Sequence, residues 1–178
     1  MDMTEAAAAP RTTSEFRIEP ATERDVPLIL QLIKGLAEYE RLADQVTATE
    51  DGLRASLFET PRAAEVVIAY SGEQPIGFAL FFHNYSTFLG RRGLYLEDLF
   101  VLPDWRRRGY GTSLLRALAR VAVDRGCGRL EWSVLAWNEP ALRFYESLGA
   151  KVLVDWRICR VVGEGMERLA KQDEHDQS

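Results

Sequence analysis

Apolar and polar positions alternate along the chain in patterns that predict a series of strands and helices. Residues 94–102 are apolar except for Glu97 and Asp98, which is typical of a buried central strand. Pro103 ends this strand because proline cannot donate a ladder hydrogen bond. Beyond it, apolar side chains recur at helical intervals, at Leu114, Leu115, Leu118, Ala119 and Ala122. The pattern therefore predicts a strand, a short loop and a helix that ends near residue 125.

Shorter patterns of the same kind predict the other elements. Strands are expected at 16–20, 65–70, 75–83, 129–136 and within 151–162, where there is room for two. Helices are expected at 26–41, 48–58, 139–148 and 163–171, with a loop at 84–93. Thr22 and Asp25 are alternative caps of the first helix, and Pro27 favours Asp25. Thr47 and Glu50 have capping-box spacing for the second helix. The resulting order, β-α-α-β-β-β-α-β-α-β, predicts the α/β class.

The length of 178 residues predicts one folded domain, at residues 16–171. Hydrophobic residues make up 47% of the chain, enough for a core, while no apolar run approaches the roughly 20 residues that span a bilayer. Residues 1–15 lack the features of a secretory signal and are expected to be a disordered leader, and residues 172–178 are a polar tail. A cytoplasmic protein without membrane attachment is expected. The net charge of −5 argues against a nucleic-acid partner.

The few cysteines and histidines show no metal-binding pattern. Cys127 and Cys159 are far apart, lack ligand spacing and are expected to be buried free thiols. His175 lies in the charged tail. His83 ends a predicted apolar strand and is expected to have a structural or solvated role, with contact to a substrate as the alternative. No metal site is predicted.

A turn rich in arginine and glycine follows the central strand. It reads Arg106-Arg107-Arg108-Gly109-Tyr110-Gly111-Thr112. The two glycines allow successive backbone N–H groups to converge with no Cβ in the way, and the start of the following helix adds positive potential. Such a turn can hold an anion such as a pyrophosphate. The alternative is a loop whose arginines are solvated and whose glycines only cap the helix.

A second motif, AWNEPALRFYESLG, spans residues 136–149. Asn138 is a good N-cap, Pro140 suits a first helical turn, and Gly149 is a typical helix stop. Tyr145 then lies two turns beyond Asn138 on the same face of the helix. Taken by itself, a tyrosine at this position is more often a core aromatic residue.

Together, the two motifs resemble those of the GNAT acetyltransferases, which use acetyl-CoA. The shared pattern is a strand, an R-x-x-G-x-G turn and a helix, followed by a strand, an Asn cap and a helix that carries Tyr145. More narrowly, KGLAEYE (34–40), YLED (95–98) and AWNEPALRFY (136–145) resemble the diamine (spermidine/spermine) and thialysine N-acetyltransferase branch. The resemblance covers residues 16–171, nearly the whole chain.

The resemblance implies the GNAT fold, an α/β fold with a mixed central sheet and helices on both faces. In that fold the strands at 94–102 and 129–136 splay apart, and the pantetheine arm of acetyl-CoA lies between them. It also implies a homodimer that pairs through C-terminal elements. Arg106 opens the turn, either as part of the motif or as a structural cation. The implied cofactor-binding residues are Leu99, Phe100, Val101, Arg107, Arg108, Gly109, Tyr110, Gly111, Thr112, Asn138, Glu139, Pro140 and Ala141.

The resemblance further implies that the amine attacks the thioester directly in a ternary complex, without an acyl-enzyme. Glu97 is implied as the amine contact and base, and Tyr145 as the general acid that protonates the leaving thiolate. Asp98 stays outside this set because strict alternation puts Glu97 and Asp98 on opposite faces of the strand. The implied substrate-binding residues are Tyr39, Glu40, Glu97, Glu131, Trp132 and Ser133.

One stretch departs from the pattern of the polyamine enzymes. They carry an acid–proline–tryptophan sequence where this chain has Tyr85-Ser86-Thr87-Phe88, so Ser86 stands where a carboxylate would hold a distal ammonium. The expected function is acetyl-CoA-dependent N-acetylation of a small cationic primary amine, which is a polyamine, a diamine or a lysine analogue such as thialysine. A protein lysine or N-terminal acetyltransferase is one alternative. A non-catalytic acyl-CoA sensor is another, although a sensor needs neither Glu97 nor Tyr145.

Overall fold

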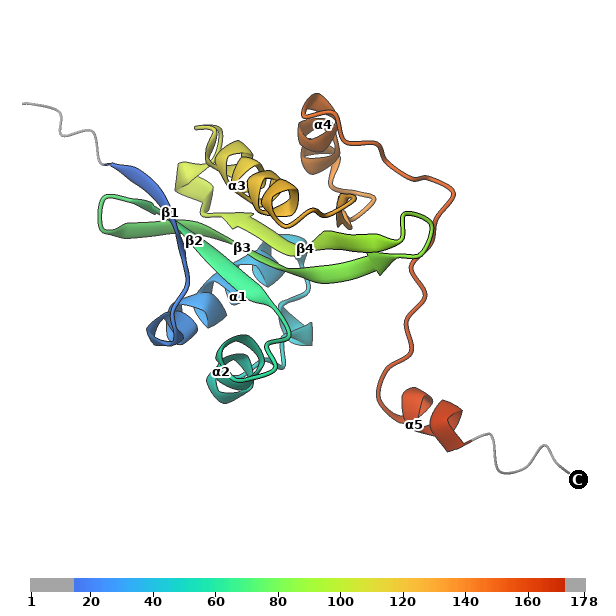
Figure 1. Ribbon diagram of the computed structural model, residues 1–178. Helices are drawn as coiled ribbons and strands as arrows, with labels where there is room; N and C mark the ends of the chain where they lie inside the picture. Colours follow the sequence, from blue (N-terminus) through green and yellow to red (C-terminus); the bar gives the residue numbers. More distant parts are fainter. Residues whose placement is uncertain (1–14, 172–178) are drawn as a thin grey trace, which may run out of the picture. The chain divides into compact units, whose positions relative to one another are not determined.

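A computed structural model describes residues 15–171, which divide into two compact units with a boundary between Ser133 and Val134 (Figure 1). The predicted tail, with His175, and the predicted leader except for Glu15 lie outside the described residues. Within the described chain, no helix is both long and apolar enough to cross a bilayer.

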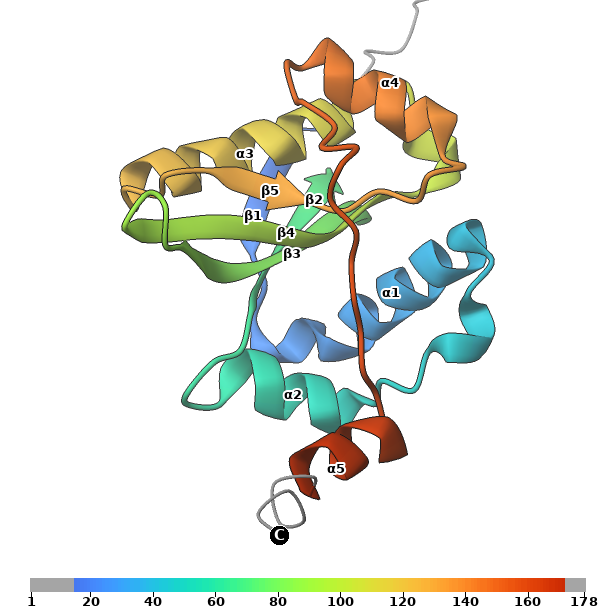
Figure 2. The same cartoon turned by 90° about the vertical axis from the view of Figure 1, so that its right-hand side faces the viewer.

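The first unit is built on a five-stranded sheet with the strand order β1-β2-β3-β4-β5. Neighbouring strands from β1 to β4 are antiparallel, and β5 pairs with β4 in parallel, so the sheet is mixed as predicted. The strands are β1 Phe16–Pro20, β2 Glu65–Ser71, β3 Gln74–Ser86, β4 Arg91–Val101 and β5 Leu130–Trp132. The helices of this unit are α1 Val26–Glu40, α2 Glu50–Phe58 and α3 Tyr110–Asp124. Figure 2 shows α3 on one face of the sheet and α1 and α2 on the other.

The two faces of this sheet are called here the α1 face and the α3 face. On the α1 face, buried apolar side chains of the helices and of β2, β3 and β4 form one cluster: Ile29, Leu32, Leu36, Leu57, Val66, Ile68, Phe78 and Phe100. The side chain of Phe78 is fully buried, which contributes about 2 kcal/mol by the usual transfer free energy. On the α3 face, α3 packs against β3 and β4 and buries Leu114, Leu115, Leu118 and Ala122. The predicted helical spacing of α3 is confirmed.

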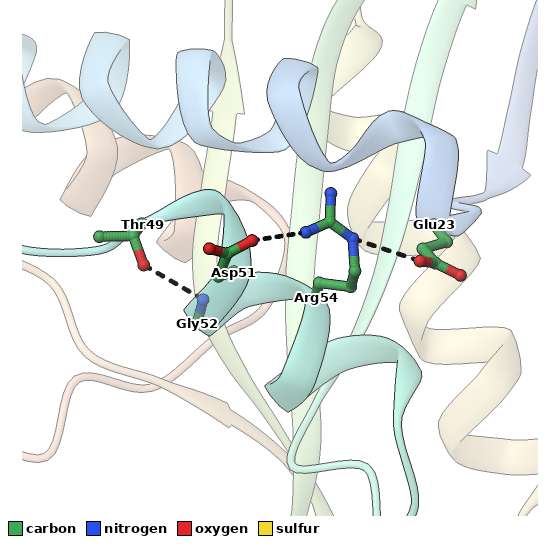
Figure 3. A network of polar contacts seen from close by, with 5 residues as sticks. All are labelled: Glu23, Thr49, Asp51, Gly52 and Arg54. Atoms are coloured by element: carbon green, nitrogen blue, oxygen red, sulfur yellow. Dashed lines mark hydrogen bonds and ion pairs between the residues drawn. The ribbon is translucent and has the colours of Figure 1, made fainter.

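Polar residues fix the starts of the first two helices. Asp25 precedes α1, with Pro27 in its first turn, while the Thr22 backbone N–H donates to Asp25 Oδ2 at 2.7 Å and closes a 3₁₀ turn just before it. The capping box predicted from Thr47 is wrong. Thr49 is the N-cap of α2, and its Oγ1 accepts a hydrogen bond from Gly52 N at 3.1 Å (Figure 3). A shift of the cap by two residues, from one threonine to another, satisfies the same need for a side-chain acceptor, and sequence spacing alone cannot distinguish the two.

Arg54 of α2 joins this helix to the segment before α1. Its Nε lies 3.2 Å from Glu23 Oε1, and its Nη1 lies 2.8 Å from Asp51 Oδ1 (Figure 3). An open depression of the surface is lined by Thr22, Glu23, Arg24 and Arg54. None of the predicted site residues lines it.

The loop predicted at 84–93 is largely strand. β3 continues to Ser86 and β4 starts at Arg91, so only the turn at 87–90 separates them. The residues responsible for the wrong prediction are polar, and the ladder pairs them as Asn84 with Gly93 and Ser86 with Arg91. Backbone pairing can extend a hairpin through polar positions when the adjoining ladder is already in register.

The second unit contains α4, Glu139–Ser147, and α5, Glu164–Lys171, both as predicted. The strand predicted at 129–136 is shorter, since β5 ends at Trp132. The strand or strands predicted within 151–162 are wrong, because these residues pair with no strand in the described chain. Their apolar side chains are exposed, including Val154, Trp156 and Ile158. Cys159 is also exposed and Cys127 is half-buried, so the expectation of two buried thiols is wrong.

Candidate active site

The β4 strand extends well beyond its pairing with β5. The parallel pairing runs from Leu94 with Leu130 to Leu96 with Trp132, whereas β4 itself continues to Val101. Within the first unit, the β4 backbone after Leu96 therefore has β3 on one side and an edge that pairs with no strand on the other. This edge contains Leu99, Phe100 and Val101, the residues predicted to pair with the amides of a pantetheine arm. Phe100 itself points to the α1 face, where its ring lies against Gly35.

A β-bulge at Glu97 interrupts the regular alternation of β4. In the ladder with β3, Asp98 pairs with Leu80 and Leu96 pairs with Phe81, which leaves Glu97 without a partner on β3. An extra residue of this kind shifts the alternation by one position. Asp98 consequently lies on the α1 face, two residues before Phe100, and Glu97 precedes it on the same face. The expectation that Glu97 and Asp98 occupy opposite faces is therefore wrong, because strict alternation fails at a bulge.

Three carboxylates gather where the end of α1 meets this bulge. Burial is the main cause that raises the pKa of Asp98, and together with the negative charges of Glu97 and Glu40 it brings this pKa to about 6. Burial also raises the pKa of Glu40, the last residue of α1. Glu97 is exposed. Within residues 15–171, none of the three is in an ion pair, so this part of the α1 face can stabilise a cation.

Arg106 links the carboxyl end of α1 to the start of the glycine turn. Its guanidinium lies 4.2 Å from the centre of the Tyr39 ring and 5.5 Å from that of Phe100, and its Nε donates to Val101 O at 2.9 Å. These contacts support the structural role considered for Arg106. They also place the Tyr39 ring against Arg106, the first residue of the turn. Tyr39 lies at the same end of α1 as Glu40.

The glycine turn has the backbone conformation that its sequence predicts. Gly109, with a φ of 86°, is the N-cap of α3, and Arg107 also has a positive φ of 61°. The first hydrogen bond of the helix runs from Ser113 N to Gly109 O at 3.0 Å, so the N–H groups of residues 110–112 precede the helical ladder. Together with the arginines at 107 and 108, these donors suit an anion such as a pyrophosphate. Tyr110 packs its ring against Phe16 and Trp105.

A polar network covers the α1 face next to the carboxylates. Tyr95 Oη and Ser133 Oγ lie 2.7 Å apart, and Glu131 pairs with Tyr95 in the parallel ladder. Asn84 Nδ2 donates to Glu131 Oε2 at 2.9 Å, and Arg129 Nε lies 2.6 Å from the same oxygen. Trp132 follows Glu131 as the last residue of β5, so alternation turns its side chain to the α3 face. Of the three substrate-binding residues predicted at 131–133, the structure thus brings Glu131 and Ser133 to the carboxylates' face.

His83 lies on the other face, away from the three carboxylates. It follows Phe81 on the α3 side of β3, near the ion pair in which Arg125 binds Glu65 at 2.5 and 2.8 Å. Burial and the positive charges of Arg125 and Arg92 lower the pKa of His83. This location agrees with a structural or solvated role for His83.

The second unit holds the other predicted motif on α4. Asn138 is buried and caps the helix, with its Oδ1 accepting from Ala141 N at 3.3 Å. Glu139 and Pro140 form the first turn, and Tyr145 follows two turns after the cap, half-buried, with its ring 5.2 Å from that of Phe144. The local structure predicted for this motif is confirmed, while the catalytic role of Tyr145 stays a prediction.

Sequence reasoning missed the contribution of Asp98, Asn84 and Arg129 to this face. Asp98 was excluded by an alternation that the bulge breaks. Asn84 and Arg129 come from a segment predicted as loop and from a strand terminus, and only the sheet register brings them together. The sole sequence signal was Gly93, which lies opposite Asn84 in β4, between β3 and β5.

Comparison with known proteins identifies the kind of protein that carries this arrangement. The profile of the family described as Acetyltransferase (GNAT) family matches residues 30–150. The chain belongs to this GNAT family. Curated relatives of the GNAT chain include a thialysine N-epsilon-acetyltransferase of Bos taurus, 42% identical over 164 residues that cover 86% of this chain and 96% of the relative. Another is the L-ornithine N5-acetyltransferase NATA1 of Arabidopsis thaliana, 34% identical over 87% of this chain and 88% of the relative.

Solved structures agree with this assignment of the fold. An integron cassette protein from the mobile metagenome of V. cholerae superposes with a TM-score of 0.74, at 27% identity, over 88% of this chain and 98% of the other. An aminoglycoside acetyltransferase from a soil metagenome has a TM-score of 0.71 at 21% identity and shows the fold alone. The predicted family and fold class are confirmed. The GNAT chain is thus an acyltransferase that acts on an amine.

Proposed function

We propose that this protein transfers the acetyl group of acetyl-CoA to a primary amine of a small cationic substrate. The observation that carries the proposal is the bulge at Glu97, which puts Glu97 and Asp98 on the α1 face of the sheet, beside Glu40 at the end of α1 and where β4 no longer pairs with β5. A small amine is mostly protonated at neutral pH, because the pKa of a primary alkylamine is about 10. In the described part of the chain the three carboxylates form no ion pair, which favours binding of that ammonium.

The residues present fit acetyl-CoA as the second substrate. The free edge of β4 offers backbone groups to the amides of the pantetheine arm, and the N–H groups of residues 110–112 and the arginines at 107 and 108 suit the pyrophosphate. When bound, acetyl-CoA supplies the activated acetyl thioester. The protein needs no nucleophile of its own for this chemistry, and the exposed Cys159 lies outside both motifs.

The catalytic roles are assigned by the resemblance to the family. Glu97 accepts the proton that the ammonium loses, directly or through a water molecule, so that the neutral amine can attack. The new N–C bond forms as the C–S bond breaks, and the phenol of Tyr145 donates a proton to the leaving thiolate. The proposal extends the confirmed family assignment to these two residues, which lie in different units of the chain.

Ser86 supports a short substrate over a long polyamine. It stands where polyamine enzymes carry a carboxylate, and here it is buried, with its Oγ accepting a hydrogen bond from Leu89 N at 3.3 Å. A hydroxyl that is buried and hydrogen-bonded within the turn between β3 and β4 does not hold a distal ammonium. Lysine analogues and small diamines remain as the proposed substrates.

We also propose that the protein is cytoplasmic and forms a homodimer. Support for the dimer comes from the second unit, in which Val154, Trp156, Ile158 and Leu169 are all more than 60% exposed. Exposed apolar side chains in one short segment are typical of an association surface. Sedimentation at micromolar concentration tests this, and a monomer there would contradict it.

The test of the activity is thiol release from acetyl-CoA in the presence of single amines. The panel contains thialysine, L-ornithine, L-lysine, putrescine, spermidine and a lysine-bearing peptide. Turnover with one or more of the small amines is expected, with little turnover of the peptide. Turnover of the peptide alone would replace the proposal by protein acetylation, and silence with every amine while acetyl-CoA still binds would overturn it.

A further inference from the structure

Arg129 and Glu131 form an ion pair whose remaining polar atoms are available to a ligand. The contacts of Glu131 with Arg129 and with Asn84 both use its Oε2 atom. Within residues 15–171, its Oε1 atom and the terminal nitrogens of Arg129 have no polar partner. Arg129 Nε makes no aligned hydrogen bond, so the pair is held by charge alone. The two side chains are 37% and 30% exposed, which leaves them accessible from solvent.

The ion pair lies beside the carboxylates on the same face of the sheet. Glu131 is opposite Tyr95, two residues before Glu97, which corresponds to about 7 Å along the strand. The side-chain amine of ornithine or lysine lies roughly 5 to 6 Å from its α-carbon when the chain is extended, given bonds of about 1.5 Å. A substrate whose amine is held at Glu97 therefore places its α-carbon next to Arg129 and Glu131.

The chemistry of the pair matches an amino-acid head group. A guanidinium binds a carboxylate with two parallel hydrogen bonds, and the free Oε1 atom of Glu131 can accept a hydrogen bond from an α-ammonium. A diamine has only a second ammonium to offer at this position. That ammonium would meet a carboxylate already paired with Arg129 and would be repelled by the guanidinium.

We propose that Arg129 and Glu131 bind the α-carboxylate and α-ammonium of an α-amino acid whose side chain ends in the acetylated primary amine. The inference rests on the proposed function and narrows its substrate class from amines in general to amino acids of the ornithine and lysine type. Arg129 is the residue that distinguishes them from diamines. Asn84 is a positioning residue, since it holds Glu131 from the far side of β4.

The experiment compares substrates that differ only in the α-carboxylate. L-ornithine is paired with putrescine and L-lysine with cadaverine, and kcat and KM are measured for the wild-type protein and for Arg129→Gln. The wild-type protein is expected to prefer each amino acid by at least about 30-fold in kcat/KM. In Arg129→Gln the KM for the amino acids rises at least about tenfold, and kcat/KM for the diamines increases because Glu131 is released from its ion pair.

The matched control is Arg125→Gln. It removes an arginine from an ion pair of similar exposure on the α3 face, with Glu65, and should leave the preference between amino acids and diamines unchanged. A preference that Arg129→Gln does not change, or a wild-type protein that accepts both members of a pair equally, would overturn the inference.

If the proposed function is wrong, no amine is acetylated, which differs from the outcomes that would overturn the subsite. Equilibrium binding of L-ornithine and of putrescine, measured calorimetrically with coenzyme A present, then decides the question without turnover. Binding of L-ornithine that weakens at least tenfold in Arg129→Gln supports the subsite, and equal binding by both proteins contradicts it.

Discussion

Asn84 on β3 and Glu131 on β5 are joined by a hydrogen bond of 2.9 Å that crosses the strand between them. The bond passes over Gly93 of β4, where a Cβ atom would lie 2.3 Å from Asn84 Oδ1 and 3.1 Å from the Cγ atom of Arg129. The glycine is thus required by the two neighbouring strands rather than by its own backbone conformation.

Gly93→Ala should therefore destabilise the protein and disturb the ion pair on β5. The new methyl group displaces Asn84 or Arg129, and overpacking of this kind costs roughly 1–3 kcal/mol. Chemical denaturation measures the loss, and the kinetic preference for amino acids over diamines should fall with it. Gly90→Ala is the control for the packing effect. The φ of 61° at Gly90 strains an alanine, but nothing lies within 4 Å of the Cβ atom that the substitution adds. A Gly93→Ala protein that keeps both its stability and its preference would contradict this account.

Gly93 shows how much of this site the sequence could predict. The strand at 94–102, the turn and the helix after it could be predicted because their apolar periodicity is long and uniform. The network of Asn84, Arg129 and Glu131 could not, because its members meet only through the register of three strands. Polar residues at 84–93 suggested a loop, yet the hairpin ladder continues through them.

Asp98 illustrates a second limit of sequence reasoning. Alternation along β4 put it on the face away from Glu97, and the bulge reverses this. No local sequence pattern predicts this bulge, because the bulge depends on how β3 pairs with β4. The strand predicted within 151–162 failed for a related reason, because apolar composition indicates a strand only if a partner strand is available.

Asp98→Asn should stabilise the protein near neutral pH and much less in acid. The pKa of Asp98 is raised from 3.8 to about 6 in the folded protein, so the folded state binds the proton more tightly than the unfolded state. The wild-type free energy of unfolding therefore falls as the pH rises from about 4 to 6, and the loss is complete above that window. The gain from Asp98→Asn at pH 7.5 is at most about 3 kcal/mol.

Urea denaturation of both proteins from pH 4 to pH 8 checks this prediction. The difference in stability between variant and wild type should grow through the window and level off above pH 7. A difference that stays constant with pH would show that Asp98 titrates near its usual value. Asp124→Asn, at an exposed carboxylate that ends α3, is the comparison.

Glu97→Gln should lower kcat/KM most strongly where the substrate amine is protonated. At pH 7 to 8 the proposed base has to take the proton of the ammonium, and loss of a general base typically costs 10²–10⁴-fold in rate. Toward pH 10 the amine is increasingly neutral, and the two proteins should converge. Glu73→Gln, in the exposed turn between β2 and β3, is a control of the same chemistry. A pH–rate profile with the same shape in Glu97→Gln and wild type would remove Glu97 as the base.

Tyr145→Phe should reduce kcat by roughly 10²–10⁴-fold while the affinity for coenzyme A stays close to that of the wild-type protein. The substitution removes the proposed proton donor of the thiolate and keeps the ring that lies beside Phe144. Since the donor acts on the leaving group, the loss should be smaller with an acetyl thioester of a more acidic thiol, which leaves without a proton. Tyr70→Phe, on β2, removes a hydroxyl from a residue that belongs to neither motif and should leave kcat unchanged. An unchanged kcat in Tyr145→Phe, or a loss that does not depend on the acidity of the thiol, would show that the phenol is not the general acid.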